Sequence, residues 1–315
     1  MNTRYIIERL LLALVVILGV TFVVFLIIHL VPGDPARVIL GVQANEENVA
    51  ALQERLGLDE PFFVQYFTWL RNAVQGDFGR SLITRQPVAP QIWDRLGATV
   101  QLAGVALLVG MAIAFPAGII SALKPGSRTD IATSILSQVG VAIPDFWLGI
   151  MLILLFSLTL GWLPSRGYTP FSEDPLDWLA HIVLPALTLG IISGSIQTRF
   201  IRSAMLEVLN ENYIRTARAK GLSERAVLVN HALRNAMITI VTIIGLQITA
   251  LLSAVVVVEV VFGWPGLGRL ALEAVLDRDY PLLQGTVLTI AVLLTLVNLA
   301  IDLLYFFLDP RIEYA

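Results

Sequence analysis

The 315-residue chain contains no cysteine, so disulfide bonds and thiolate metal sites are excluded. It has only three histidines, His29, His181 and His231, and their wide separation in the sequence does not indicate a metal cluster. We therefore predict neither a bound metal nor a cofactor.

Charged side chains are also scarce. They make up 14% of the residues, whereas a typical soluble domain carries about 25%. Hydrophobic residues make up 57% of the chain, and this excess favours a protein of the lipid bilayer. The net charge of -3 is too small to indicate nucleic acid as a partner.

Sequence motifs of common enzymes are missing as well. The chain has no H-E-x-x-H zinc motif, no G-x-S-x-G nucleophile elbow and no G-x-x-x-x-G-K-[ST] phosphate loop. A protein that binds ATP through a phosphate loop is therefore excluded. If ATP drives a process in which this chain takes part, the ATPase is another polypeptide.

Long apolar stretches are what the sequence does contain. A membrane-spanning helix needs about 20 mostly apolar residues. Such stretches predict six spanning helices in an all-α polytopic membrane protein, at residues 10–31, 99–123, 131–160, 179–200, 236–262 and 282–308. The first is longer than the apolar core of a signal peptide and no small-x-small cleavage site follows it, so we expect it to be retained.

The third stretch is too long and too polar in its first half for one plain helix. Pro144 and Asp145 divide it. Proline removes a backbone donor and kinks or restarts a helix, and we expect Asp145 to cap the restarted segment.

The charges of the short loops predict orientation. One side of the predicted membrane holds these basic residues: Arg4, Arg9, Lys124, Arg128, Arg202, Arg215, Arg218, Lys220, Arg225 and Arg234. The short loops of the opposite side are richer in acidic residues. The positive-inside rule places both termini in the cytoplasm and the long loop after the first span outside.

Small residues recur at a spacing of four in two spans, a pattern that lets helix backbones approach closely. They are Gly110, Ala114 and Gly118 in the second span and Ala186, Gly190 and Gly194 in the fourth. We favour packing within one subunit over an interface between subunits.

Three acidic residues lie in or near the apolar spans: Asp145, Glu259 and Asp302. Intramembrane acids indicate function by default, although Asp302 is near enough to a span end to reach the interface. We expect Gln247 and Glu259 to lie on roughly the same face of the fifth span. With Ser253 they predict a polar stripe along a translocation pathway, and hydrogen bonding between helices is the alternative.

A cytoplasmic segment at residues 207–235 is too long for a simple turn. Its composition predicts two short helices around Gly221, a residue type that ends helices in the left-handed conformation. Ser223 is expected to cap the second helix. Arg215, Arg218 and Lys220 are expected to present a basic face, which would serve a protein partner or anionic lipid.

This segment resembles the "EAA" loop of binding-protein-dependent ABC importer permeases. Arg215, Thr216 and Ala217 stand at the E-A-A positions and Gly221 matches the loop glycine. Further on, the family's proline is replaced by Arg234. The sequence pattern Y-x-R-T-A-R-A-K-G followed by H-A-L-R-N is similar to that of the dipeptide/oligopeptide/nickel permease group.

Other segments carry the same resemblance. They are LGLDEP at residues 56–61, GDFGRS at 76–81, VEVVFGWPGLG at 258–268, RDYP at 278–281 and DPR at 309–311. The long outer loop resembles that of the B-type subunit.

The resemblance implies a type I ABC importer permease fold in a prokaryotic inner membrane. It implies four kinds of neighbour: a homologous second permease, two ATPase subunits or domains, an external solute-binding protein and the bilayer. It also implies that the loop around Gly221 is a coupling helix seated on the ATPase, formed by Arg215, Thr216, Ala217, Arg218, Ala219, Lys220, Gly221 and Leu222.

The resulting division assigns residues 1–31 to the N-terminus and first span and 32–98 to a folded outer cap. Residues 99–308 form a five-helix permease core, and 309–315 a cytoplasmic tail. The apolar helical face around Phe63 and Phe67 favours a cap that meets the solute-binding protein, with a helix on the membrane surface as the alternative.

Two other classes of protein would account for part of the pattern. An ion-driven secondary carrier would explain buried acids, but it predicts internal repeats that the sequence does not show convincingly. An intramembrane enzyme would need a nucleophile–base pair or a metal cluster. The solute itself is left open among dipeptides, oligopeptides, glutathione, nickel chelates and oligosaccharides.

Overall fold

The computed structural model describes residues 3–30, 37, 40, 44–57 and 59–308, and within these ranges the regular structure is helical. Five helices are long and apolar enough to cross a membrane: Ile7–Leu26, Val88–Leu123, Pro175–Leu209, Glu224–Phe262 and Tyr280–Leu303. A sixth candidate is a bent pair, Arg128–Ala142 with Asp145–Thr159. The predicted all-α fold is therefore confirmed, with five spans, or six if the bent pair is one span. The predicted tail at 309–315 and residues 31–36, 38–39, 41–43 and 58 of the segment after the first span lie outside the described residues.

Two of the spanning helices are much longer than the predicted spans. Helix α5 (Val88–Leu123) has 36 residues and α8 (Pro175–Leu209) has 35. At 1.5 Å per residue these helices are about 50 Å long, whereas the hydrocarbon core is about 30 Å thick. Hydropathy locates only the part of a helix that is expected to lie in the hydrocarbon, so the polar extensions were missed.

The third span is broken where proline predicts it. Helix α6 (Arg128–Ala142) ends before Pro144, and α7 (Asp145–Leu152) begins after it and continues as the π-helix η2 (Ile153–Thr159). The two parts meet at 103°. The expected capping role of Asp145 is wrong, because Pro144 takes the N-cap position and no side chain caps α7. Asp145 instead lies in the first turn, where the helix dipole favours negative charge.

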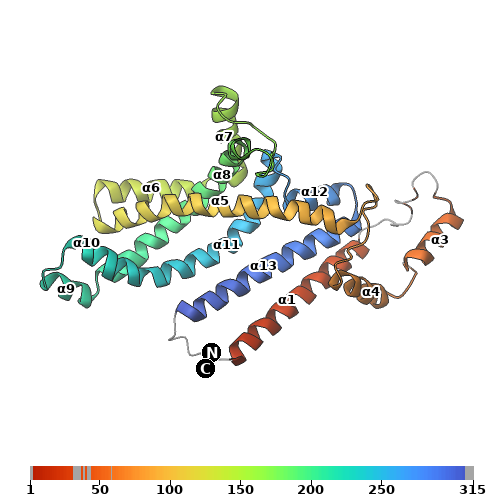
Figure 1. Ribbon diagram of the computed structural model, residues 1–315, viewed down its shortest axis with the longest axis horizontal. Coiled ribbons are helices and arrows are strands. Elements are labelled where there is room, and N and C mark those ends of the chain that lie inside the picture. The colour runs from red at the N-terminus through yellow and green to blue at the C-terminus, as the bar shows by residue number, and fades with distance from the viewer. Residues whose placement is uncertain (1–2, 31–36, 38–39, 41–43, 58, 309–315) are drawn as a thin grey trace. The chain divides into compact units, whose positions relative to one another are not determined.

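The chain forms two compact units, each shown as part of Figure 1. Unit 1 comprises Met1–Ala98 and Pro265–Leu299. It holds α1 (Thr3–Leu30), α3 (Glu46–Leu56), α4 (Phe62–Val74), the first turns of α5, α12 (Leu267–Leu276) and most of α13 (Tyr280–Leu308). The outer loop thus contains helices, as predicted. The buried core of this unit consists of Val88, Ile92, Leu267, Leu270, Ala274 and Leu282.

A buried carboxylate organises one corner of unit 1. Asp279, which is 2% exposed, accepts hydrogen bonds from the Ser81 hydroxyl and from the Leu82 backbone N–H at 3.1 Å. It also accepts the Leu282 N–H at the start of α13. The RDYP segment therefore has a structural role, because its aspartate fixes the turn at residues 80–87 to the start of α13.

Unit 2 comprises Thr99–Trp264 and Ala300–Ala315. Within it α8 packs against α6 and against α11 (Arg234–Phe262), and Figure 1 shows the short helices α9 (Asn212–Ala219) and α10 (Glu224–Ala226) together at one end. The small residues join α5 to α8. A Cβ added to Gly110 would lie 2.7 Å from Ser193 Oγ, and one added to Gly194 would lie 2.9 Å from the Gly110 carbonyl oxygen. The predicted packing within one subunit is confirmed.

Candidate functional site: the coupling loop and its connections

The loop that the sequence analysis predicts to be cytoplasmic, here called the coupling loop, begins where α8 ends at Leu209. Helix α9 follows, then a turn at Gly221, and then α10, which continues through the π-helix η3 (Val227–Leu233) into α11. Both sequence predictions for this turn are confirmed. Two short helices flank Gly221, and the Ser223 hydroxyl caps the second by accepting the Ala226 N–H at 3.3 Å.

Gly221 ends α9 in a Schellman arrangement. Its φ is +79°, its N–H donates to the Arg218 carbonyl at 2.9 Å, and the Leu222 N–H donates to the Ala217 carbonyl at 3.4 Å. A Cβ at Gly221 would meet no atom within 4 Å. The requirement for glycine within this chain is therefore conformational and not steric.

Helix α9 has one buried side and one exposed side. Ile214 is fully buried and Ala217 is 7% exposed, so both face the interior of unit 2. The other seven predicted coupling residues are exposed: Arg215, Thr216, Arg218, Ala219, Lys220, Gly221 and Leu222. The structure thus divides the predicted set into an anchor, Ala217, and a surface that is available to a partner.

The basic surface differs from the prediction at Arg218. Its guanidinium donates to both carboxylate oxygens of Glu224, at 2.9 and 3.2 Å. This charge is already compensated within the chain, so Arg215 and Lys220 contribute most of the positive charge that the exposed side offers.

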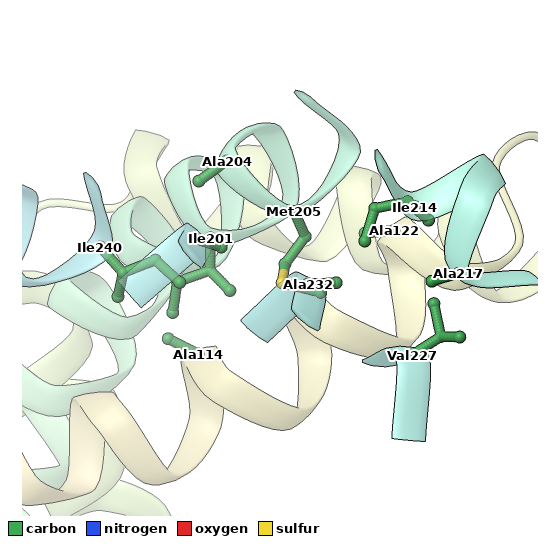
Figure 2. Close-up of a cluster of buried hydrophobic side chains, with 11 residues drawn as sticks. Ala114, Ala122, Ile201, Ala204, Met205, Ile214, Ala217, Val227, Ala232 and Ile240 are labelled. Carbon is green, nitrogen blue, oxygen red and sulfur yellow. The ribbon is translucent and has the colours of Figure 1, made fainter. Parts of the chain in front are cut away.

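The buried side of α9 joins a cluster that reaches four other elements. Figure 2 shows Ile214 beside Ala122 of α5, and Ala217 beside Val227 of η3. The whole cluster consists of Ala114, Ala122, Ile201, Ala204, Met205, Ile214, Ala217, Val227, Ala232, Ala236 and Ile240. Through this packing α9 is connected directly to α5, α8 and α11.

An ion pair joins α6 to two of these helices, α5 and α8. Arg202 of α8 donates from Nε and Nη2 to the two carboxylate oxygens of Asp130, at 2.6 and 2.9 Å. The Ser121 hydroxyl of α5 and the Gly126 N–H also donate to this carboxylate, which is 6% exposed. The pair fixes α6 to α5 and α8. The sequence placed Arg202 among the cytoplasmic charges but gave no sign of its partner 72 positions away.

The π-helix η3 was also missed. A π-turn inserts one extra residue into a helix, and such turns are frequent at functional sites. Helix η3 leads directly into α11, and it contains the residues H-A-L of the H-A-L-R-N pattern that resembles the permease family. Nothing in the hydrophobic pattern distinguishes it from an ordinary helical turn.

The predicted polar stripe on α11 is wrong as a single face. Twelve residues turn a helix by three turns and about 120° more, so Gln247 and Glu259 do not align. Glu259 is fully buried and accepts the Thr99 hydroxyl at 2.6 Å. Ser253 is exposed and donates to the Thr249 carbonyl of its own helix, while Gln247 is half-buried.

The C-terminal end of α11 is closed by a second Schellman arrangement. Gly263 has a φ of +66°, its N–H donates to the Val260 carbonyl, and the Trp264 N–H donates to the Glu259 carbonyl. The Trp264 ring is fully buried and meets Tyr168 edge-on at 4.8 Å.

Comparison with known proteins assigns this arrangement to a family. Residues 114–314 match the binding-protein-dependent transport system inner membrane component, and residues 2–103 match the N-terminal region of such membrane components. The chain belongs to this family. Together the matches cover both the coupling loop and the outer loop.

Curated relatives agree over the full length. The dipeptide transport system permease protein DppB of Alkalihalophilus pseudofirmus is 42% identical, with 98% of this chain and 99% of that protein covered. The oligopeptide permease AppB of Bacillus subtilis is 41% identical over 98% and 99%. The glutathione permease GsiC of Escherichia coli K12 is 42% identical over 99% of both chains.

A solved structure shares the fold. The inward-facing MetNI methionine ABC transporter aligns with a TM-score of 0.58 and 17% identity, covering 70% of this chain and 98% of that one. The predicted type I importer permease fold is confirmed. The chain is the multi-pass, inner-membrane permease subunit of an ATP-driven importer, and the alternative of an ion-driven carrier is not supported.

Proposed function

We propose that this permease imports dipeptides or similar small peptides. It would do so together with a homologous permease, two cytoplasmic ABC ATPase subunits or domains and an external solute-binding protein. The observation that carries the proposal is α9, a short helix with an exposed side and a side buried among the spans. The names of the relatives, which transport dipeptides, oligopeptides and glutathione, support the peptide class.

In this proposal the exposed side of α9, from Arg215 to Leu222, seats in a groove of the ATPase. Both termini are cytoplasmic, residues 32–98 lie outside with α3 available to the solute-binding protein, and ATP is hydrolysed only by the partner subunits. The basic loops at Arg215 and Lys220 support this orientation through the positive-inside rule.

The movement would pass from the ATPase into the spans. Closure of the ATPase pair displaces α9, and Ile214 and Ala217 carry the displacement into the packed cluster. The Asp130–Arg202 pair holds α6 to α8, so that these helices tilt together. Such rigid-body rocking opens the pathway alternately to the two sides.

The translocation pathway is proposed to pass α11, whose polar residues Gln247 and Ser253 are not fully buried. Glu259 takes a different role from the one first expected. Because its carboxylate is fully buried and bound to Thr99, we propose that it holds the outer end of α11 against α5 in this conformation.

The Gly221→Val variant tests the coupling role. Valine at a φ of +79° costs about 1–2 kcal/mol, which is enough to displace a helix that must seat accurately. In the complex reconstituted with its loaded binding protein, we expect ATP-dependent dipeptide uptake to fall about tenfold. ATP hydrolysis should lose its stimulation by the binding protein.

Gly161→Val is the matched control. Gly161 also has a positive φ, +65°, and a Cβ added there would meet no atom within 4 Å, but it lies outside the coupling loop. It should retain uptake. Wild-type uptake and stimulation in the Gly221→Val complex would contradict the coupling assignment.

A further inference from the structure

Helix α4 of the outer loop contacts α1 at a level that belongs to the membrane. The Tyr66 hydroxyl hydrogen-bonds Thr21 Oγ1 at 2.9 Å, and both side chains are buried. Thr21 lies inside the apolar stretch of α1, five residues before Leu26, and apolar residues continue after Leu26 in the sequence. At 1.5 Å per residue the contact is therefore at least about 8 Å from the end of this stretch measured along α1.

Ring contacts show which part of α4 packs against α1. Phe62 and Trp69 are seven residues apart, about 10 Å along α4, yet both rings lie within 6 Å of the Phe25 ring centroid. Tyr66, between them, packs on Phe22 and Phe25. On α1 these contacts run from Leu18, whose carbonyl accepts the Tyr66 hydroxyl at 3.4 Å, to Phe25. If α1 spans the bilayer, the first two turns of α4 therefore lie at the level of its apolar stretch.

The two exposed sides of α4 differ in polarity. Phe63, Phe67, Leu70 and Val74 form one stripe at spacings of four, three and four residues, and Phe63 and Phe67 are each 62% exposed while Val74 is 81% exposed. A second exposed side presents Thr68, Arg71 and Asn72, together with the apolar Val64, which is 47% exposed. A third side, with Tyr66 and Ala73, is buried in unit 1.

We propose that α4 is an interfacial helix whose stripe Phe63, Phe67, Leu70 and Val74 is buried in phospholipid, in the outer leaflet if the orientation proposed above holds. An amphipathic helix at a membrane buries its apolar side among the lipids, and the Tyr66–Thr21 contact places α4 beside the apolar stretch of α1. The apolar surface of α1 continues at the same level through Leu18 and Val23, which are 39% and 50% exposed.

Lipid explains this surface better than a soluble binding protein does. A water-soluble partner would have to reach below the apolar boundary of α1 to cover the stripe. Aromatic rings next to polar side chains are enriched at membrane interfaces, and α4 has five aromatic residues within its first eight. The inference requires only that α1 spans the bilayer, so it is independent of the coupling role of α9.

The absence of cysteine allows a direct test. Phe67→Cys on the stripe and Thr68→Cys on the polar side are adjacent in sequence, and each would carry a bimane fluorophore. The complex, with cysteine-free partner subunits, is reconstituted into phosphatidylcholine–phosphatidylglycerol vesicles. Nitroxide-labelled phosphatidylcholine serves as the lipid-phase quencher and iodide as the aqueous one.

We expect nitroxide lipid to quench the probe at residue 67 at least about threefold more than the probe at 68, and iodide to show the reverse order. Equal quenching of both probes by iodide would overturn the proposal in favour of a water-facing or docking surface. Protection of residue 67 from both quenchers would overturn it in favour of a protein partner such as the second permease. Phe63→Cys, on the same stripe, repeats the measurement if the Phe67 variant does not fold.

Discussion

Two helix ends in unit 2 use the same backbone device with opposite results. At Gly221 and at Gly263 a left-handed glycine closes the helix with the same pair of hydrogen bonds. The residue after Gly263, Trp264, is fully buried, whereas the residue after Gly221, Leu222, is 42% exposed. One end is completed by its own chain, and the other presents an apolar side chain that its own chain does not cover. The motif sets the turn, and its neighbours determine whether the turn is a structural element or an interface.

The largest effect is expected for Trp264→Ala, which tests whether the end of α11 is completed by its own chain. Removing a buried aromatic ring that packs on Tyr168 should destabilise the subunit by about 3–5 kcal/mol. The measurement is the unfolding free energy of the purified chain in mild detergent under added denaturant. A loss below about 1 kcal/mol would show that the end of α11 is not completed by this ring.

A smaller effect is expected for Thr99→Val, which keeps the shape of the side chain but removes the hydroxyl that donates to Glu259. Loss of a hydrogen bond to a buried carboxylate costs about 1–3 kcal/mol. The same unfolding assay applies, with Thr68→Val as a control because Thr68 is exposed on α4. Equal stability of the Thr99 variant and wild type would argue against Glu259 as the tie between α5 and α11.

The smallest effect on stability is expected for Leu222→Ala, within about 0.5 kcal/mol, because the side chain is already partly in solvent. Its effect should appear in assembly instead. We expect the affinity of the permease pair for the ATPase to fall about fivefold to tenfold, or about 1 kcal/mol, in a pull-down titration. A stability loss as large as that of Trp264→Ala would remove the distinction between the two ends.

The features that sequence predicted correctly are local. Proline at 144, glycine at 221 and serine at 223 act on their own turn of backbone, so their consequences can be deduced without knowing the fold. The six spans follow from composition in the same way. The resemblance to a permease family added the identity of the loop, which composition alone would have left as a basic surface segment.

The features that sequence missed depend on distant partners. The Asp130–Arg202 pair and the inward orientation of Ala217 exist only because α5, α6, α8 and η3 converge. Arg218 seemed free until the turn at Gly221 brought Glu224 beside it. The polar stripe on α11 failed for a simpler reason, since a twelve-residue interval does not return to the same side of a helix.

The glycine contacts between α5 and α8 have a mechanical consequence. Gly110 and Gly194 leave no room for even one carbon atom between the helices, and Gly118 is as close to Ile201. Sliding one helix along the other would bring a side chain to each of these points, where atoms of the neighbouring helix already occupy the space. Translation of one helix past the other is therefore opposed by packing. In the coupling mechanism proposed above, the two helices would move as one lever arm, and a push at the α9 end would be passed on as rotation without slippage between them.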